Sequence, residues 1–78
     1  MKTVTIYGPG CKRCDRVVAL VEEAAARLGL QVDVQKVTDA RAIAVAGVMS
    51  TPGLAIDGRL VHTGGLPAVR ALEGWLSA

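Results

Sequence analysis

The sequence contains no phenylalanine, one tyrosine and one tryptophan, so its interior must be built from aliphatic side chains. It has neither a run of basic residues nor an aromatic ladder, which argues against nucleic acid as a partner. No apolar stretch approaches the roughly 20 residues of a membrane-spanning helix. The first residues lead into a strand pattern instead of a signal peptide. We therefore expect a cytoplasmic protein with no membrane association.

The chain has 78 residues and a net charge of +2. This length allows one domain, residues 1–78, and leaves no room for a second core. Hydrophobic residues make up 51% of the sequence, mostly Ala, Val, Leu and Ile, which suits closely packed helices on a small sheet. The protein is expected to be a monomer.

Only two cysteines are present, Cys11 and Cys14, which is too few for a secreted disulfide scaffold. They follow a strand-breaking segment, Gly8-Pro9-Gly10, and open a helical pattern. At this spacing the two cysteine side chains are close enough to form a disulfide that closes a small ring, and this disulfide is readily reduced again. The spacing therefore predicts a redox dithiol.

The two thiols are expected to have different roles. Cys11 lies at the predicted helix N-terminus, where unpaired N–H groups, the helix dipole and the cations Lys12 and Arg13 favour a thiolate. A thiol of low pKa is also a good leaving group, so Cys11 is assigned as nucleophile and Cys14 as resolving thiol. Cys14 falls on the apolar stripe of the helix and is expected to be buried. Lys12 and Arg13 are equally well explained as solvated residues.

Hydrophobic periodicity predicts the element order β-α-β-α-β-β-α. Strands are expected at residues 3–7, 30–35, 54–56 and 60–61, and helices from the dithiol to about residue 28, from Thr38 or Asp39 to about residue 46, and from Pro67 onward. Asp57-Gly58 predicts a two-residue hairpin turn. Because a long helix separates the first two strands, they should form a right-handed parallel βαβ unit with the second strand at an edge.

Ser50-Thr51-Pro52 stands just before the third expected strand. With the Cys-x-x-Cys between the first strand and helix, it makes the chain resemble the thioredoxin fold in its smallest form. The chain is similar to small prokaryotic thioredoxin-like and glutaredoxin-like proteins, the redox-active disulfide protein family, through its YGxGCxxC and TPGLxIDG patterns. This resemblance covers essentially the whole chain. It implies an α/β minimal thioredoxin fold, with a four-stranded mixed sheet flanked by three helices.

The resemblance also implies a set of site residues. Thr51 and Pro52, at the position of a cis-proline in this family, would form the wall that receives substrate beside Cys11. A proline there has no N–H, which leaves the neighbouring backbone free to pair with an extended substrate. The expected substrate-binding residues are Thr51, Pro52, Lys12, Arg13 and Tyr7, although Tyr7 is also explained by packing.

The expected function is thiol–disulfide oxidoreductase activity through a mixed disulfide. Disulfide-containing proteins or small molecules are the expected substrates, and a thioredoxin-reductase-like enzyme or a small thiol is the expected electron donor. No metal and no cofactor other than the Cys11–Cys14 disulfide is expected. Reductants and oxidants share this motif and differ in reduction potential.

Three departures from the larger relatives limit what the resemblance implies. The chain has no tryptophan before its first cysteine. Thr5 occupies the position, six residues before the first cysteine, where the thioredoxin pattern has a buried acid. An internal base for Cys14 is therefore missing or supplied by another residue. Gly64-Gly65 resembles the glycine pair of glutaredoxins, but the acid that follows it there is absent, which makes glutathione the weaker candidate substrate.

A Cys-x-x-Cys also occurs in copper- or zinc-carrying domains, which remain the alternative to a redox role, as does a static role for the cysteines. The small copper carriers have Met where this chain has Pro9 and follow a different element order. Two thiols cannot by themselves complete a tetrahedral zinc site. Elsewhere, His62 is expected to be a solvated strand residue, and Trp75 and Met49 are expected to fill space in the packing.

Overall fold

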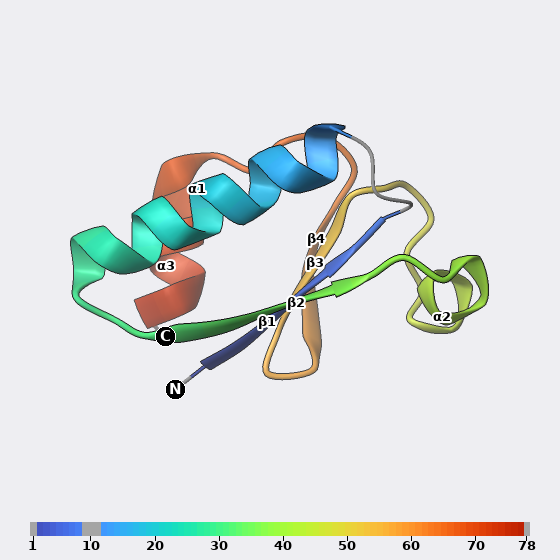
Figure 1. Cartoon of the computed structure of the whole chain (residues 1–78), viewed down its shortest axis with the longest axis horizontal. Helices are drawn as coiled ribbons and strands as arrows, with labels where there is room; N and C mark the ends of the chain where they lie inside the picture. Colours follow the sequence, from blue (N-terminus) through green and yellow to red (C-terminus); the bar gives the residue numbers. More distant parts are fainter. Residues whose placement is uncertain (1, 9–11, 78) are drawn as a thin grey trace.

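The computed structural model describes residues 2–8 and 12–77 (Figure 1). Within these residues the elements follow the predicted order. The strands are β1 (Lys2–Tyr7), β2 (Val32–Val37), β3 (Gly53–Ile56) and β4 (Arg59–Thr63), and the helices are α1 (Lys12–Leu28), α2 (Ala40–Val45) and α3 (Val69–Ser77). The predicted α/β fold class is thereby confirmed.

The four strands form one mixed sheet in the order β2-β1-β3-β4. β1 and β2 are parallel, whereas β3 runs antiparallel to both β1 and β4. β2 lies at an edge, as the sequence predicts. Helices α1 and α3 lie together over one face of the sheet, and α2 lies past the carboxyl end of β2 (Figure 1). The first turn of α1, which carries Cys14, therefore lies at the same end of the sheet as α2.

The core lies between the sheet and the helix pair α1 and α3. Val4 and Ile6 of β1 are almost completely buried, as are Leu72 and Leu76 of α3. The core cluster consists of Val4, Ile6, Cys14, Val17, Val21, Ala24, Ala25, Leu54, Ile56, Leu72 and Leu76. Each fully buried aliphatic side chain of this size contributes about 1.5–3 kcal/mol. Trp75 packs at the margin of the cluster and is half-buried.

The second strand is displaced by two residues from its predicted range. Gly29 ends α1 with a positive φ of 68°, as predicted, and the Leu30 N–H donates to the Ala25 carbonyl at 2.9 Å. Leu30 thus belongs to the C-terminal cap of α1 and not to β2. Pairing with β1, from Lys2↔Val32 to Tyr7↔Val37, instead extends β2 to Val37.

The predicted ends of α2 and the hairpin are confirmed. Asp39 is the N-cap of α2, because its carboxylate accepts the Ala42 N–H at 3.2 Å. Asp57 and Gly58 both have positive φ, 52° and 84°, as a tight turn between twisted strands requires. The strands on either side are longer than predicted, because β4 continues to Thr63.

The predicted start of the last helix at Pro67 is wrong. The Leu72 N–H donates to the Ala68 carbonyl at 3.1 Å, and α3 begins at Val69. Pro67 lies two residues earlier and is buried. Its place is explained by packing, because an apolar ring that has no N–H to satisfy is suited to a buried loop.

Candidate functional site

The predicted nucleophile Cys11 lies outside the described residues, together with Pro9 and Gly10. The backbone of Arg13 lies in α1, but its side chain is also outside the description. The described part of the site therefore comprises Cys14 and the residues that surround it.

Cys14 is the third residue of α1, and only 3% of it is exposed. The prediction that it lies on the buried face is confirmed. At this position the thiol lies in the first turn of a helix, where the dipole and the unpaired N–H groups favour a negative charge. Burial has the opposite effect, since it disfavours a thiolate. The state of this thiol thus depends on the groups around it.

Gly8 gives the Cys14 sulfur its space. A methyl group at Gly8 would overlap Cys14 Sγ and would lie 3.9 Å from Thr51 Cβ. The Gly8 N–H donates to the Val37 carbonyl at 2.9 Å, which fixes this backbone to the edge strand. Cys14 and Thr51 therefore both lie beside Gly8. Sequence analysis identified Gly8 only as a strand breaker, because nothing local shows which residue packs against it.

The segment with Thr51 and Pro52 is fixed to the end of β4. The Thr51–Pro52 peptide bond is cis, Pro52 is fully buried and Thr51 is half-buried. The Gly64 N–H donates to two carbonyls of this segment, those of Ser50 at 3.0 Å and Pro52 at 2.9 Å. Gly64 has a φ of 71°, which a residue with a side chain rarely adopts. In this structure Gly64 holds the Pro52 segment in place, a role that sequence analysis missed.

The surface beside Thr51 is apolar. A pocket of about 260 Å³ is lined by Thr38, Ala40, Ile43, Ala44, Val48 and Thr51. In the adjoining α2–β3 region, Val45 is 82% and Met49 is 94% exposed. The expectation that Met49 fills a gap is therefore wrong, because its side chain is exposed to solvent although the neighbouring Val48 is buried. Of the other predicted contact residues, Tyr7 is half-buried at the end of β1 and Lys12 is exposed.

An ion pair lies beside Cys14. Lys36 Nζ of β2 donates to Asp15 Oδ1 in the first turn of α1 at 2.9 Å. The hydrogen bond with Asp15, followed by the charge of Asp15 and that of Cys14, raises the pKa of Lys36 above its ordinary value. Sequence analysis did not single out either residue. The sequence signal that could have identified Lys36 is its position, because it is a charged residue that follows Val32 and Val34 at the same spacing of two.

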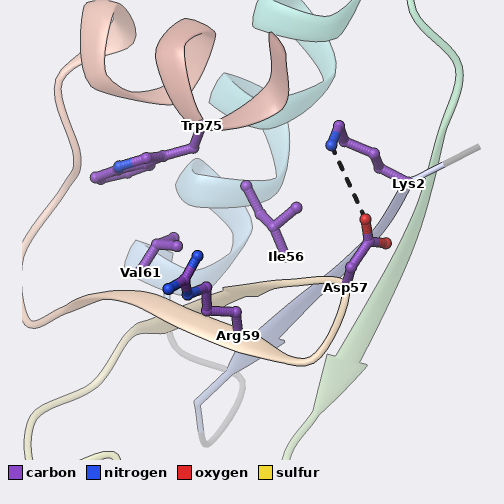
Figure 2. Close-up of a pocket in the computed structure, with 6 residues that line it drawn as sticks. All are labelled: Lys2, Ile56, Asp57, Arg59, Val61 and Trp75. Atoms are coloured by element: carbon purple, nitrogen blue, oxygen red, sulfur yellow. Dashed lines mark ion pairs between the residues drawn. The ribbon is translucent and has the colours of Figure 1, made fainter. Parts of the chain in front are cut away.

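A separate pocket of about 350 Å³ lies at the opposite end of the sheet, bordered by α3 (Figure 2). Its lining residues are Lys2, Ile56, Asp57, Arg59, Val61 and Trp75. Next to it, the rings of His62 and Trp75 are 5.9 Å apart, so His62 packs against the helix instead of being fully solvated. Among the described residues, no group of three His, Cys, Asp or Glu side chains could hold a metal ion.

Comparison with known proteins agrees with this arrangement. The thioredoxin domain family matches residues 2–77. The chain belongs to this family. It is 36% identical over 73 residues to a thioredoxin of Methanocaldococcus jannaschii, covering 94% of this chain and 84% of the relative. It is 32% identical over 77 residues to a thioredoxin of Methanothermobacter thermautotrophicus, covering 99% and 100% respectively.

A solved structure shows the same thioredoxin fold. The J-Trx1 fragment of ERdj5 superposes with a TM-score of 0.62 at 23% identity, over 97% of this chain and 40% of that one. The thioredoxin relatives support an oxidoreductase role in general terms. In the described part of the chain, no helix is long and apolar enough to cross a membrane.

Proposed function

We propose that this thioredoxin-family protein is a thiol–disulfide oxidoreductase in which Cys11 is the nucleophile and Cys14 the resolving thiol. The observation that supports this most directly is the position of Cys14. It lies in the first turn of α1, is 3% exposed, and packs where Gly8 meets Thr51. A thiol in this position is sheltered from external disulfides. The spacing of three residues between Cys11 and Cys14 would let the two sulfurs meet within the protein.

The proposed reaction has two exchange steps. The Cys11 thiolate attacks one sulfur of a substrate disulfide, so that a Cys11–substrate bond forms and the other substrate sulfur leaves as a thiolate. Cys14 then loses its proton to water and attacks Cys11 Sγ. The Cys11–Cys14 bond forms as the second substrate thiolate leaves. Two electrons pass from the dithiol to the substrate, and a reductase or a small thiol must reduce the enzyme again.

The substrate would lie along Thr51 and Pro52. The Pro52 segment is fixed by its hydrogen bonds to Gly64, so its backbone presents a constant surface to an extended chain. The apolar pocket beside Thr51 has room for a side chain of the substrate. We propose disulfide-containing proteins as the substrates and the cytoplasm as the location, where dithiols of this kind are catalytic rather than structural. The protein would act as a monomer without a further cofactor.

Trapping the mixed disulfide tests the proposal. The Cys14→Ser protein should accumulate a disulfide between Cys11 and an oxidised protein such as insulin, detectable by mass spectrometry and released by dithiothreitol. The Cys11→Ser protein and the double variant should trap nothing and should not reduce insulin. If Cys14→Ser traps no partner while Cys11→Ser reduces insulin at the wild-type rate, the proposal is wrong.

The midpoint potential of the dithiol determines the direction of the reaction. A value near roughly −270 mV would match a reductant of the thioredoxin type, whereas one near roughly −120 mV would match an oxidant. Equilibration with glutathione buffers, followed by alkylation and mass measurement of the wild-type protein, gives this value directly. Cys14→Ser, which cannot form the intramolecular bond, is the matched control.

A further inference from the structure

Two cations project from the face of the sheet that the helices cover. Side chains alternate along a strand, so Lys2 shares a face with Val4, a core residue of β1 that is fully buried. Arg59 of β4 is paired in register with Ile56, which is 7% exposed and belongs to the core cluster. Residues opposite each other on neighbouring strands project from the same face. Long charged side chains therefore occupy positions at this margin of the core where apolar residues would close it.

The pocket at the amino end of β1 lies among these cations and Trp75 (Figure 2). Its volume of about 350 Å³ falls at the lower end of the range for small-molecule sites. Figure 2 shows the indole ring of Trp75 above and the guanidinium group of Arg59 below, with the apolar side chains of Ile56 and Val61 beside them. The pocket thus offers an aromatic ring, two aliphatic side chains and a planar cation.

The charges that line the pocket do not cancel. Asp57 is used within the fold, because its carboxylate accepts the Thr3 N–H at 2.9 Å and pairs with Lys2 at 3.9 Å. Within the described residues Arg59 forms no ion pair, and it is exposed. Two cations against one acid leave an excess of one positive charge. This excess lies on a guanidinium group, which binds carboxylates through two parallel N–H bonds.

We propose that this pocket is a binding site for a small aromatic carboxylate. In this arrangement the ring of the ligand stacks on Trp75 and covers Ile56 and Val61, and its carboxylate accepts the N–H bonds of Arg59. A carboxylate carries the single negative charge that the pocket lacks, whereas a phosphate monoester carries about two. The pocket and Cys14 lie at opposite ends of the sheet, so the proposal does not depend on the function of the dithiol.

Titration of isotope-labelled protein with 2-naphthoate, followed by nuclear magnetic resonance, tests the site. Trp75 is the only tryptophan, so its indole N–H gives a single resonance that reports on this pocket. We expect a saturable shift of this resonance with a dissociation constant of about 0.1–1 mM, the range for a ligand of this size. 2-Naphthamide, which has the same rings and no charge, should bind about tenfold more weakly.

Two variants separate recognition by Arg59 from general attraction of an anion to the protein. Arg59→Gln should weaken binding of 2-naphthoate about tenfold and leave binding of 2-naphthamide unchanged. Arg41→Gln, which removes an exposed cation from α2 at the other end of the sheet, should change neither affinity. Both substituted side chains are exposed, so both variants should fold, which circular dichroism checks.

Three results would each overturn the inference. The first is a Trp75 resonance that does not move as 2-naphthoate is added. The second is equal affinity of the wild-type protein for the acid and the amide. The third is an Arg41→Gln variant that binds 2-naphthoate as weakly as Arg59→Gln does. A tenfold loss that is confined to Arg59→Gln and to the charged ligand supports the site.

Discussion

The two ends of β1 carry different kinds of surface. At its carboxyl end, Gly8, Cys14 and Thr51 approach closely because Gly8 has no side chain. At its amino end, the long side chains of Lys2 and Arg59 border an open pocket of about 350 Å³ (Figure 2). The first region consists of small groups in contact, and the second of large groups around a space.

This difference shows why the proposed redox site does not coincide with that pocket. Sulfur exchange requires one sulfur to reach another and a substrate chain to lie across a surface, and neither requires a deep cavity. The residues that line the pocket at the amino end include no cysteine. Substitutions at the carboxyl end should therefore change redox chemistry, and substitutions at the amino end should leave it unchanged.

The largest effect is expected from Gly8→Ala. The added methyl would overlap Cys14 Sγ, so the helix or the strand must move, at a cost of about 2–3 kcal/mol in the free energy of unfolding. The rate of disulfide reduction should fall with it. Urea denaturation and insulin reduction measure the two quantities.

Gly74→Ala is the matched control for Gly8→Ala. Gly74 lies within α3, and a methyl there meets nothing within 4 Å. This change should stabilise the protein by about 0.5–1 kcal/mol, because alanine is the better helix former. Equal effects of the two substitutions would contradict the close packing at Gly8.

The next largest effect is expected from Gly64→Ala. Alanine must adopt the positive φ of 71°, and its methyl would lie 3.2 Å from Ser50 Cβ. Together, the strained backbone and the close contact should lower the free energy of unfolding by about 2 kcal/mol. They should also displace the Pro52 segment and so lower the reduction rate. Gly47→Ala separates the two causes, because Gly47 has a φ of 84° and open space around it. If Gly47→Ala slows reduction as much as Gly64→Ala does, backbone strain alone explains both.

A smaller effect, on stability and not on redox chemistry, is expected from Asp57→Ala at the amino end. The Asp57 carboxylate accepts the Thr3 N–H at 2.9 Å and forms an ion pair with Lys2 at 3.9 Å. Losing the hydrogen bond should lower the free energy of unfolding by about 1 kcal/mol, and Lys2→Met, which removes the partly exposed ion pair but leaves that hydrogen bond, should lower it by less. The reduction rate and the Cys14 pKa should remain unchanged. A changed Cys14 pKa would mean that the two ends are coupled.

The smallest effect concerns stability at alkaline pH. Because the pKa of Lys36 is raised in the folded protein, its ion pair stabilises the fold below the ordinary lysine pKa of 10.5. This contribution is lost as the pH rises through the raised value. The difference in melting temperature between wild type and Lys36→Met should therefore be present at pH 8 and should shrink as the pH rises above the ordinary lysine pKa of 10.5.

Lys12→Met is the control for the alkaline series. Within the described residues Lys12 forms no ion pair, so its removal should leave no comparable difference in melting temperature at either pH. A difference between wild type and Lys36→Met that persists at high pH would show that lost packing of the lysine stem, and not its charge, is responsible.

Local patterns were sufficient for most of the fold. Gly29 and Asp39 mark helix ends because a left-handed cap and a side-chain cap depend on adjacent backbone only. Asp57-Gly58 marks the hairpin for the same reason. Leu30 was assigned to the wrong element because its apolar character suits both a strand and a helix cap. The pairing of Val32 with Lys2, which is not local, decided between them.

The site was less predictable than the fold. The burial of Cys14 follows from helical periodicity, and Thr51-Pro52 was found through the family pattern. The roles of Gly8 and Gly64 depend on contacts with residues many positions away, such as Thr51 and Ser50. No window of sequence contains both members of such a contact, so sequence patterns cannot reveal them.

By itself, the sequence determined the element order, the end of α1, both ends of α2, the hairpin turn, and the placement of one cysteine on a buried face. These features depend on the periodicity of side chains and on the backbone preferences of single residues. Only the tertiary structure decided that Cys14 and Thr51 both lie beside Gly8, and that Lys36 extends from the edge strand to Asp15. Strand register and helix packing set these distances, because they bring together residues that are far apart in the chain.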